Sequence, residues 1–126
     1  MKLLNGRTIL IVEDEQMNRQ IARSVLEMAG AAVVEAVDGQ EAVRLVLSDQ
    51  SQTIDLILMD ISMPKMNGYD ASLAIRQSTY PRAKEIKIYA ITADIMCYEE
   101  GKWREARMNG VLEKPLDYRD VVKILE

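Results

Sequence analysis

The 126-residue sequence contains no histidine, no phenylalanine and one cysteine, Cys97. A lone cysteine excludes an internal disulfide, and the absence of histidine leaves a zinc site without its usual ligands. Histidine is also excluded as a general base and as a phosphohistidine carrier within this chain. We interpret Cys97 as a small apolar filler of the interior.

Excess positive charge and long apolar runs are lacking too. The 16 Lys and Arg residues stand against 20 Asp and Glu residues, and the net charge of −4 disfavours binding to nucleic acid and to anionic membranes. The N-terminal segment MKLLNGRT lacks the long apolar stretch that a signal peptide or a membrane span requires. We therefore expect a cytoplasmic chain without membrane contact, although a longer parent protein could be membrane-anchored.

Five short apolar runs alternate with segments of helical period. The runs are rich in Val, Ile and Leu and do not alternate strictly with polar residues, which is typical of strands covered on both faces in a parallel sheet. The alternation predicts a flavodoxin-like, doubly wound α/β fold with five parallel strands in the order 2-1-3-4-5 and five helices. We expect one domain over residues 1–126, with a core from about residue 7. The predicted strands are 8–12, 32–36, 56–59, 86–91 and 111–112, and the last two predicted helices are about 95–108 and 118–126.

The first three predicted helices have recognisable ends. The first carries one apolar stripe, and Gly30 ends it. Asp38 is expected to cap the second helix with Glu41 as its capping-box partner, and Asn67 to cap the third. The residues expected to face the interior are Met17, Ile21, Val25 and Met28 in the first helix, Ala42, Val43, Val46 and Leu47 in the second, Ala71, Ala74 and Ile75 in the third, and Val121, Val122 and Leu125 in the fifth.

Polar side chains stand where the predicted strands end. Glu13 and Asp14 follow the first strand, and the third, fourth and fifth end at Asp60, Thr92 and Lys114. In doubly wound sheets, ligands bind outside the carboxyl ends of the strands, where the winding order switches. Strands one and three are neighbours in the predicted order, so the three carboxylates are expected to converge in one pocket. Taken singly, each acid would be explained as a solvated loop residue.

Three neighbouring carboxylates need compensation. Two unit charges about 5 Å apart repel by roughly 3 kcal/mol at an effective dielectric constant of about 20. The pocket must therefore hold a counter-cation, or the pKa of one acid must rise. Oxygen ligands in a partly open site suit Mg²⁺, with Mn²⁺ as an alternative, and Mg²⁺ also accepts phosphate oxygens as ligands. The cluster predicts a magnesium site that receives a phosphoryl group.

The remaining residues suit phosphoryl chemistry. Asp60 can act as a carboxylate nucleophile that forms an acyl phosphate. Lys114 and Mg²⁺ would spread the charge on the phosphoryl oxygens, and Thr92 offers these oxygens a hydroxyl donor. Alone, Thr92 would be explained by its preference for strands and Lys114 by ordinary surface exposure. Pro115 behind Lys114 indicates a constrained bend.

Four motifs, in their order and spacing, resemble the receiver domain of two-component response regulators. They are VEDE at 12–15, MDISMPKMNG at 59–68, ITA at 91–93 and EKP at 113–115. Any one of these motifs alone would be weak, but four in register are highly specific. The resemblance extends from about residue 7 to residue 126, and LNGRTILIVEDEQMNRQIA is most similar to receivers attached to hybrid sensor histidine kinases.

The resemblance implies a role for each acid. Asp60 would be the phosphoacceptor, taking a phosphoryl group in a Mg²⁺-dependent reaction. Asp14 and Asp60 would bind Mg²⁺ directly, together with the backbone carbonyl of Ser62. Glu13 would act mainly through a bound water.

The resemblance also implies roles for the other strand-end residues. Lys114 would pair with Asp60 or with its phosphoryl group, and the Lys114–Pro115 bond would be cis. Thr92 would move towards the phosphoryl oxygen after transfer, and the small Ala93 would leave it room.

A signalling domain, not a turnover enzyme, follows from the same resemblance. The domain would promote its own phosphorylation and dephosphorylation, and the phosphodonor would be a histidine kinase or a histidine phosphotransfer protein. A downstream protein partner would bind the surface of the fourth helix, fifth strand and fifth helix, and the chain itself would bind no nucleic acid.

The sequence departs from the family pattern at two positions. Val111 stands where members often carry a switching Tyr or Phe, and a β-branched residue is stiff at χ1. Arg107 stands where a glycine usually closes the fourth helix, and Gly101 weakens that helix by about 1 kcal/mol relative to alanine. We hypothesise a loosely held fourth helix that transmits output through a change in its order. Tyr98 and Trp103 on this helix either face a partner or pack in the interior.

Two other functions are compatible with the same fold. A phosphatase or phosphotransferase with an aspartyl-phosphate intermediate would usually show Asp-x-Asp at the nucleophile, but Asp60-Ile61-Ser62 lacks the second acid. A phosphorylation-independent binding module would have no need for all five site residues, which are Glu13, Asp14, Asp60, Thr92 and Lys114. The phosphoacceptor receiver is therefore the leading prediction.

Overall fold

The computed structural model describes residues 3–49, 53–61, 67–93 and 100–126. Five strands form one parallel sheet in the order β2-β1-β3-β4-β5, which confirms the predicted topology. The first two strands have the predicted bounds, and the third continues to Asp60. The strands are β1 (Thr8–Val12), β2 (Ala32–Ala36), β3 (Leu56–Asp60), β4 (Lys87–Thr92) and β5 (Gly110–Glu113).

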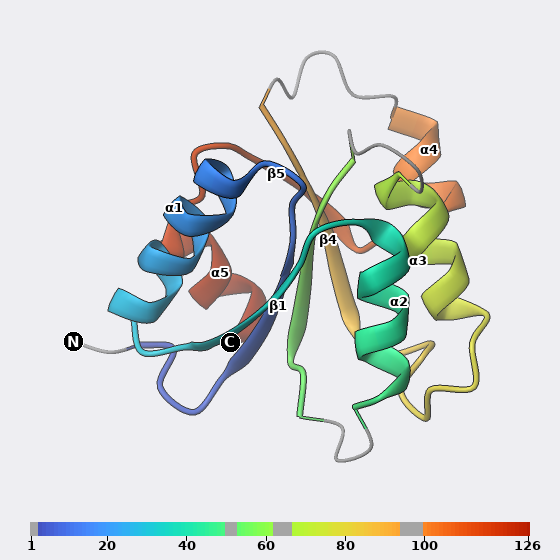
Figure 1. The fold of residues 1–126 in the computed structure, drawn as a ribbon, viewed down its shortest axis with the longest axis horizontal. Helices are drawn as coiled ribbons and strands as arrows, with labels where there is room; N and C mark the ends of the chain where they lie inside the picture. The colour runs from blue at the N-terminus through green and yellow to red at the C-terminus, as the bar shows by residue number, and fades with distance from the viewer. Residues whose placement is uncertain (1–2, 50–52, 62–66, 94–99) are drawn as a thin grey trace.

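Helices cover both faces of the sheet, as Figure 1 shows. One face carries α1 and α5, and the other carries α2, α3 and α4. This is the doubly wound, single-domain arrangement expected from the sequence. Within the described part of the chain, no helix combines the length and the apolar character that crossing a bilayer requires. The helices are α1 (Gln16–Met28), α2 (Gly39–Leu47), α3 (Gly68–Arg76), α4 (Glu100–Glu105) and α5 (Tyr118–Leu125).

The central strands are buried on both sides, which accounts for their continuous apolar sequence. Successive side chains of a strand point to opposite faces of the sheet. Leu10 and Ile57 therefore pack in the cluster beneath α2 and α3, whereas Ile9 and Leu56 pack in the cluster beneath α1 and α5. Each fully buried side chain of this size contributes about 1.5–3 kcal/mol. This burial fixes the register of β1 and β3, and with it the point where each strand ends.

The face of α1 that packs on the sheet is not the predicted one. Met17, Ile21 and Met28 are 67%, 49% and 80% exposed, whereas Ala22 and Leu26 are buried. The expectation that the stripe of large apolar residues faces the core is therefore wrong. The helix therefore packs on the sheet through Ala22 and Leu26 and leaves the larger side chains of Met17, Ile21 and Met28 at the surface.

The predicted caps of α2 and α3 are present. The Asp38 carboxylate accepts a hydrogen bond from Glu41 N at 2.8 Å, and Asn67 caps α3 in the same way. The Glu41 carboxylate in turn accepts a hydrogen bond from Val37 N at 2.8 Å. In a standard capping box the donor would be the N–H of the cap residue itself, here Asp38. Leu47 is 41% exposed, so its predicted inward orientation is wrong. It lies at the end of α2, one residue beyond the buried stripe.

The end of α4 is tied to α3 by polar side chains. Arg107 has a φ of 60°, so the turn keeps a left-handed backbone although this conformation is costly for arginine. Arg76 Nε donates to Arg107 O at 2.9 Å, and Ser72 Oγ donates to Ala106 O at 2.7 Å. These bonds hold the strained turn in place. The C-terminal end of α4 is therefore more firmly held than the sequence indicates.

Trp103 packs against the core cluster beneath α2 and α3, which supports packing over full exposure. The Lys114–Pro115 peptide bond is cis, as the family resemblance implies. Cys97, Tyr98 and the predicted start of the fourth helix lie outside the described residues.

Candidate functional site

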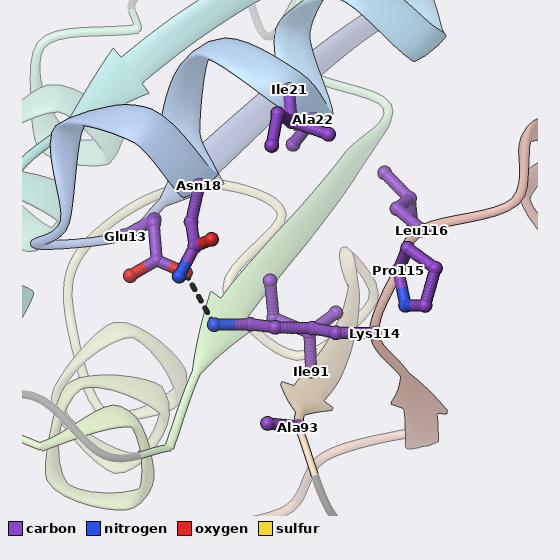
Figure 2. Close-up of a pocket in the computed structure, with 9 residues that line it drawn as sticks. All are labelled: Glu13, Asn18, Ile21, Ala22, Ile91, Ala93, Lys114, Pro115 and Leu116. Carbon is purple, nitrogen blue, oxygen red and sulfur yellow. Dashed lines mark hydrogen bonds and ion pairs between the residues drawn. The ribbon is translucent and has the colours of Figure 1, made fainter.

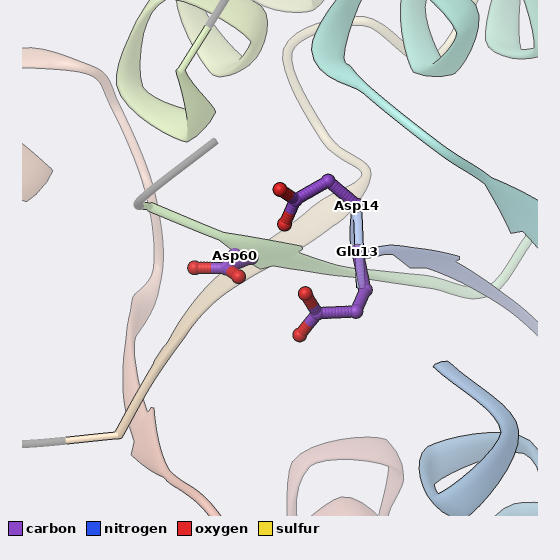
Figure 3. A group of neighbouring side chains, drawn as sticks. All are labelled: Glu13, Asp14 and Asp60. Atoms are coloured by element: carbon purple, nitrogen blue, oxygen red, sulfur yellow. The ribbon is translucent and has the colours of Figure 1, made fainter. Parts of the chain in front are cut away.

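Three carboxylates meet at the carboxyl ends of β1 and β3. The register pairs Val12 with Met59, so Glu13 and Asp60 follow as neighbours. One carboxylate oxygen from each of Glu13, Asp14 and Asp60 lies within 4.8 Å of the others, and Figure 3 shows the three side chains converging. Glu13 and Asp60 are 2% and 5% exposed, whereas Asp14 faces solvent. The cluster is thus buried on one side and open on the other.

Lys114 reaches this cluster from the end of β5. Its Nζ lies 2.5 Å from Glu13 Oε1 and 3.3 Å from Asp60 Oδ2, and Figure 2 shows the side chain extended towards Glu13. The backbone N–H of Lys114 donates to Thr92 O at 2.7 Å, which anchors the lysine beside the end of β4. The ammonium therefore lies against two of the three acids, and the nearer one is Glu13.

Burial and pairing both act on the pKa values of these groups. Burial raises the pKa of Glu13, and hydrogen bonds from Lys114 and from Glu15 N only partly oppose this. Burial lowers the pKa of Lys114, but the ion pairs with Glu13 and Asp60 outweigh it, so this pKa is raised. The ammonium therefore stays protonated at neutral pH and offsets one of the three carboxylate charges. A second cation would find an attractive site here.

The other residues expected at the site lie around this centre. Thr92 is the last residue of β4 and is 8% exposed. Ala93 lines the cavity into which Lys114 extends. Val111 on β5 packs against the core cluster beneath α2 and α3, so no aromatic side chain occupies that position. Ser62 lies outside the described residues.

A cavity of about 280 Å³ opens beside the acids. One wall comes from α1, with Ile21 and Ala22, and the opposite wall comes from Pro115 and Leu116 after β5 (Figure 2). Lys114 also lines this cavity, with its ammonium directed towards Glu13. The charged centre is therefore flanked by apolar surface on the side of α1.

Backbone packing fixes the position of Asp60. Gly68, at the start of α3, lies so close to the end of β3 that a Cβ atom there would be 2.5 Å from Asp60 O. The sequence signal was a glycine eight residues after the aspartate. Only a residue without a side chain allows α3 to begin at this distance from Asp60.

One supporting residue was not found by the sequence analysis. Arg19 of α1 donates from Nη1 to Glu13 O at 2.9 Å and to Asp14 O at 3.4 Å. An arginine early in an amphipathic helix usually lies in solvent, so the sequence carried no signal for this contact.

The site therefore combines three chemical capacities. Asp60 supplies a carboxylate nucleophile, the acids supply oxygen ligands for a hard divalent cation, and Lys114 supplies a fixed positive charge.

Residues 9–126 match the response regulator receiver domain family. The chain belongs to this family. The matched range includes all the residues of the site described above.

Sensor kinases are among the relatives of this receiver domain. The CAI-1 autoinducer sensor kinase/phosphatase CqsS of Vibrio cholerae is 39% identical over 121 residues, which cover 96% of the chain and 17% of CqsS. Histidine kinase 1 of Arabidopsis thaliana is 33% identical over 154 residues, which cover 98% of the chain and 13% of that kinase. The chain therefore spans less than a fifth of these relatives.

A solved structure supports the same assignment. The receiver domain of the sensor histidine kinase PA1611 from Pseudomonas aeruginosa PAO1 superposes with a TM-score of 0.82 at 32% identity. The match covers 95% of the chain and 94% of that domain, whose structure holds a magnesium ion in the active site cleft.

Proposed function

We propose that this receiver domain takes a phosphoryl group onto Asp60 from a phosphohistidine of a partner protein, in a Mg²⁺-dependent reaction. One observation carries the proposal. Glu13, Asp14 and Asp60 converge within 4.8 Å, and Lys114 Nζ lies 3.3 Å from Asp60. A nucleophile, cation ligands and a fixed positive charge at one edge of the sheet are the parts that phosphoryl transfer needs.

In the proposed transfer, a carboxylate oxygen of Asp60 attacks the phosphorus atom. A P–O bond forms, the P–N bond to the donor imidazole breaks, and its electron pair stays on the imidazole nitrogen. Lys114, held beside Asp60, stabilises the charge on the phosphoryl oxygens. Because Asp60 is 5% exposed, its carboxylate is largely shielded from bulk water before the donor binds.

The three acids of the site offer the oxygen ligands that Mg²⁺ prefers. Asp14 and Asp60 would hold the ion directly with the backbone carbonyl of Ser62, and Glu13 would contribute through a water. When bound, Mg²⁺ would neutralise charge on the acids and on the phosphoryl oxygens. The PA1611 receiver domain, with a magnesium ion in its cleft, supports this choice, and Mn²⁺ has a similar ligand preference.

A protein donor fits the surface beside the site. Met17 and Ile21 of α1 are 67% and 49% exposed, and Ile21 also lines the cavity opposite Pro115 and Leu116. Exposed apolar surface next to a reactive group is typical of protein-binding sites. We therefore propose that the donor, a histidine kinase or a histidine phosphotransfer protein, docks against α1.

After transfer, the Thr92 hydroxyl would donate to a phosphoryl oxygen, and the small Ala93 would leave it room. The change would pass to a downstream protein partner through the surface of α4, β5 and α5. Because Val111 lacks an aromatic ring, we propose that the signal passes through a change in the order of α4, which spans Glu100–Glu105.

The proposed switch is reversible. Water attacks the phosphorus, the P–O bond to Asp60 breaks, phosphate leaves, and the carboxylate is regenerated. The domain, with a core over about residues 7–126, would act in the cytoplasm as a signalling switch and not as a turnover enzyme. It would do so alone or within a longer protein.

Incubation with acetyl phosphate and Mg²⁺, followed by intact mass spectrometry, tests this function. The wild type should gain the mass of one phosphoryl group, Asp60→Asn should gain none, and EDTA should prevent the gain. Asp120→Asn, which changes an exposed carboxylate of α5, is the matched control and should be labelled like the wild type. A folded wild type without a mass gain, or equal labelling of Asp60→Asn, would contradict the proposal. Turnover of a small phosphate ester would instead support a phosphatase.

A further inference from the structure

Arg19 reaches from α1 back to the backbone of two site acids. Its Nη1 donates to Glu13 O at 2.9 Å and to Asp14 O at 3.4 Å. The Arg19 side chain is 15% exposed, so the guanidinium is largely shielded from water. Hydrogen bonds from a charged donor are stronger than neutral ones, and more so when shielded. One cationic group therefore holds two consecutive peptide groups of the turn between β1 and α1.

Arg19 is itself oriented by β2. Its Nε donates to Glu35 Oε1 at 3.1 Å, and Glu35 also pairs with Arg23, one turn further along α1. The guanidinium is planar and rigid, so fixing Nε also fixes the direction in which Nη1 points. The contacts thus run from Glu35 through Arg19 to the carbonyls of the turn.

The other hydrogen bonds of this turn are donated by the backbone N–H groups of residues 13 and 15. Glu13 N donates to Ala36 O at 3.1 Å, and Glu15 N donates to Glu13 Oε2 at 3.2 Å. Asp14 lies between them with an exposed side chain. Because packing does not hold the Asp14 carboxylate, its position follows the backbone that Arg19 binds.

We infer that Arg19, oriented by Glu35, is a positioning residue that sets the Mg²⁺ affinity of the acid site through the backbone of Glu13 and Asp14. Arg19 would touch neither the ion nor the phosphoryl group. Removing groups that orient metal ligands weakens metal binding by roughly 10- to 100-fold. Arg19 acts through the backbone, so we expect the lower end of this range. The inference rests on the proposed Mg²⁺ site.

A purely structural role for Arg19 would give a different result. The Arg19–Glu35 pair would then only stabilise α1 against β2, and its loss would lower thermal stability without a selective effect on Mg²⁺. Arg23 is a matched control, because it lies on the same helix and also pairs with Glu35. Its other described partner is Glu27, at 3.0 Å, and not the turn that carries the acids.

Isothermal titration calorimetry of the unphosphorylated chain with MgCl₂ separates these roles. Arg19→Ala should bind Mg²⁺ about tenfold more weakly than the wild type, and Arg23→Ala should stay within about twofold. Glu35→Gln keeps Arg19 but loses its charged acceptor, so it should lie between them. Thermal unfolding without Mg²⁺ shows whether Arg19→Ala and Arg23→Ala are matched in stability.

Labelling by acetyl phosphate gives a second measurement. Arg19→Ala should need about tenfold more Mg²⁺ for half of its maximal rate, but should approach the wild-type rate at saturating Mg²⁺. A loss confined to the maximal rate would overturn the inference, since Arg19 would then act on the transfer step and not on the cation.

The outcomes distinguish the inference from the function on which it rests. Equal Mg²⁺ affinity for Arg19→Ala and Arg23→Ala, with normal binding by the wild type, would overturn the inference alone. A wild type that neither binds Mg²⁺ nor is labelled would overturn both. If Arg19→Ala does not fold, Arg19→Lys decides. Lysine keeps the positive charge but lacks the planar array of N–H donors of the guanidinium. About threefold weaker Mg²⁺ binding by Arg19→Lys supports the inference, and unchanged binding overturns it.

Discussion

Lys114 Nζ and Glu13 Oε1 lie 2.5 Å apart, which is closer than the 3.3 Å between Lys114 and Asp60. The ammonium therefore neutralises part of the charge that would attract Mg²⁺. Replacing Lys114 by methionine should raise Mg²⁺ affinity by about threefold, because one competing cation is removed. The same variant should be labelled by acetyl phosphate at least about tenfold more slowly, because the phosphoryl oxygens lose a fixed positive charge.

Calorimetry and timed mass spectrometry measure these two effects. Lys123→Met, which removes an exposed lysine of α5, is the control and should leave both unchanged. Weaker Mg²⁺ binding by Lys114→Met would show that the lysine supports the cation site and does not compete with it.

Gly68→Ala should damage the site and the fold together. The new methyl group would meet Asp60 O at 2.5 Å, so α3 or the end of β3 must shift. We expect a loss of about 1–3 kcal/mol in the free energy of unfolding, with slower labelling of Asp60. Urea unfolding and acetyl phosphate labelling check this result.

Gly101→Ala is the matched glycine substitution. Nothing lies within 4 Å of a Cβ at Gly101, in α4, so alanine should raise the free energy of unfolding by up to about 1 kcal/mol. Loss of stability at both glycines, or at neither, would contradict the proposed packing of Gly68 against Asp60.

Tyr80 should make the fold sensitive to alkaline pH. Burial and the bond from its hydroxyl to Asp49 Oδ2, at 2.9 Å, raise the pKa of Tyr80 to about 12. An unfolded tyrosine loses its proton near pH 10. Between these values the unfolded state binds fewer protons than the folded state, so the free energy of unfolding falls as pH rises.

Tyr80→Phe should therefore lose less stability than the wild type between about pH 9 and about pH 11, as measured by urea unfolding at each pH. Tyr118→Phe is the control, since Tyr118 is 38% exposed. An equal pH dependence in Tyr80→Phe and the wild type would rule out this linkage.

Arg76 is a buried cation without a carboxylate among its described partners. The side chain is 5% exposed, and burial together with the charge of Arg107 lowers its pKa. Arg76→Met should lower the free energy of unfolding by about 3 kcal/mol, because two buried and two partly buried acceptors lose their donor. The acceptors are Ala83 O, Ile86 O, Arg107 O and Asn109 Oδ1.

Urea unfolding measures the loss, and hydrogen exchange should show faster exchange at residues 107–109. Arg119→Met provides the control, because the Arg119 side chain is 73% exposed and its solvent-screened pair with Asp117 should contribute little to stability. Similar losses for the two arginines would contradict a clamp between α3 and the end of α4.

The fold and the polar strand ends could be predicted from the sequence because they depend on local patterns. Apolar runs indicate two-sided burial, and polar or charged residues stand at the ends of the first, third, fourth and fifth runs. In a parallel sheet those ends must meet at one edge, so Asp60 and Lys114 could be placed together although they lie far apart in the sequence.

The packed face of α1 could not be predicted in the same way. The helix has two apolar sides, and the choice between Ile21 and Ala22 depends on how closely the helix approaches the sheet. The contacts of Arg19 and Arg76 were missed because most of their acceptors are backbone carbonyls. No residue type in the sequence marks a carbonyl that lacks a partner.

The most direct test of the central claim is to identify the phosphorylated residue chemically. Sodium borohydride reduces an aspartyl phosphate to homoserine, which peptide mass spectrometry locates. After treatment with acetyl phosphate and Mg²⁺, we predict homoserine at position 60 and at no other aspartate. Homoserine at Asp14 or elsewhere, or its absence from a fully labelled chain, would contradict the assignment of Asp60 as the phosphoacceptor.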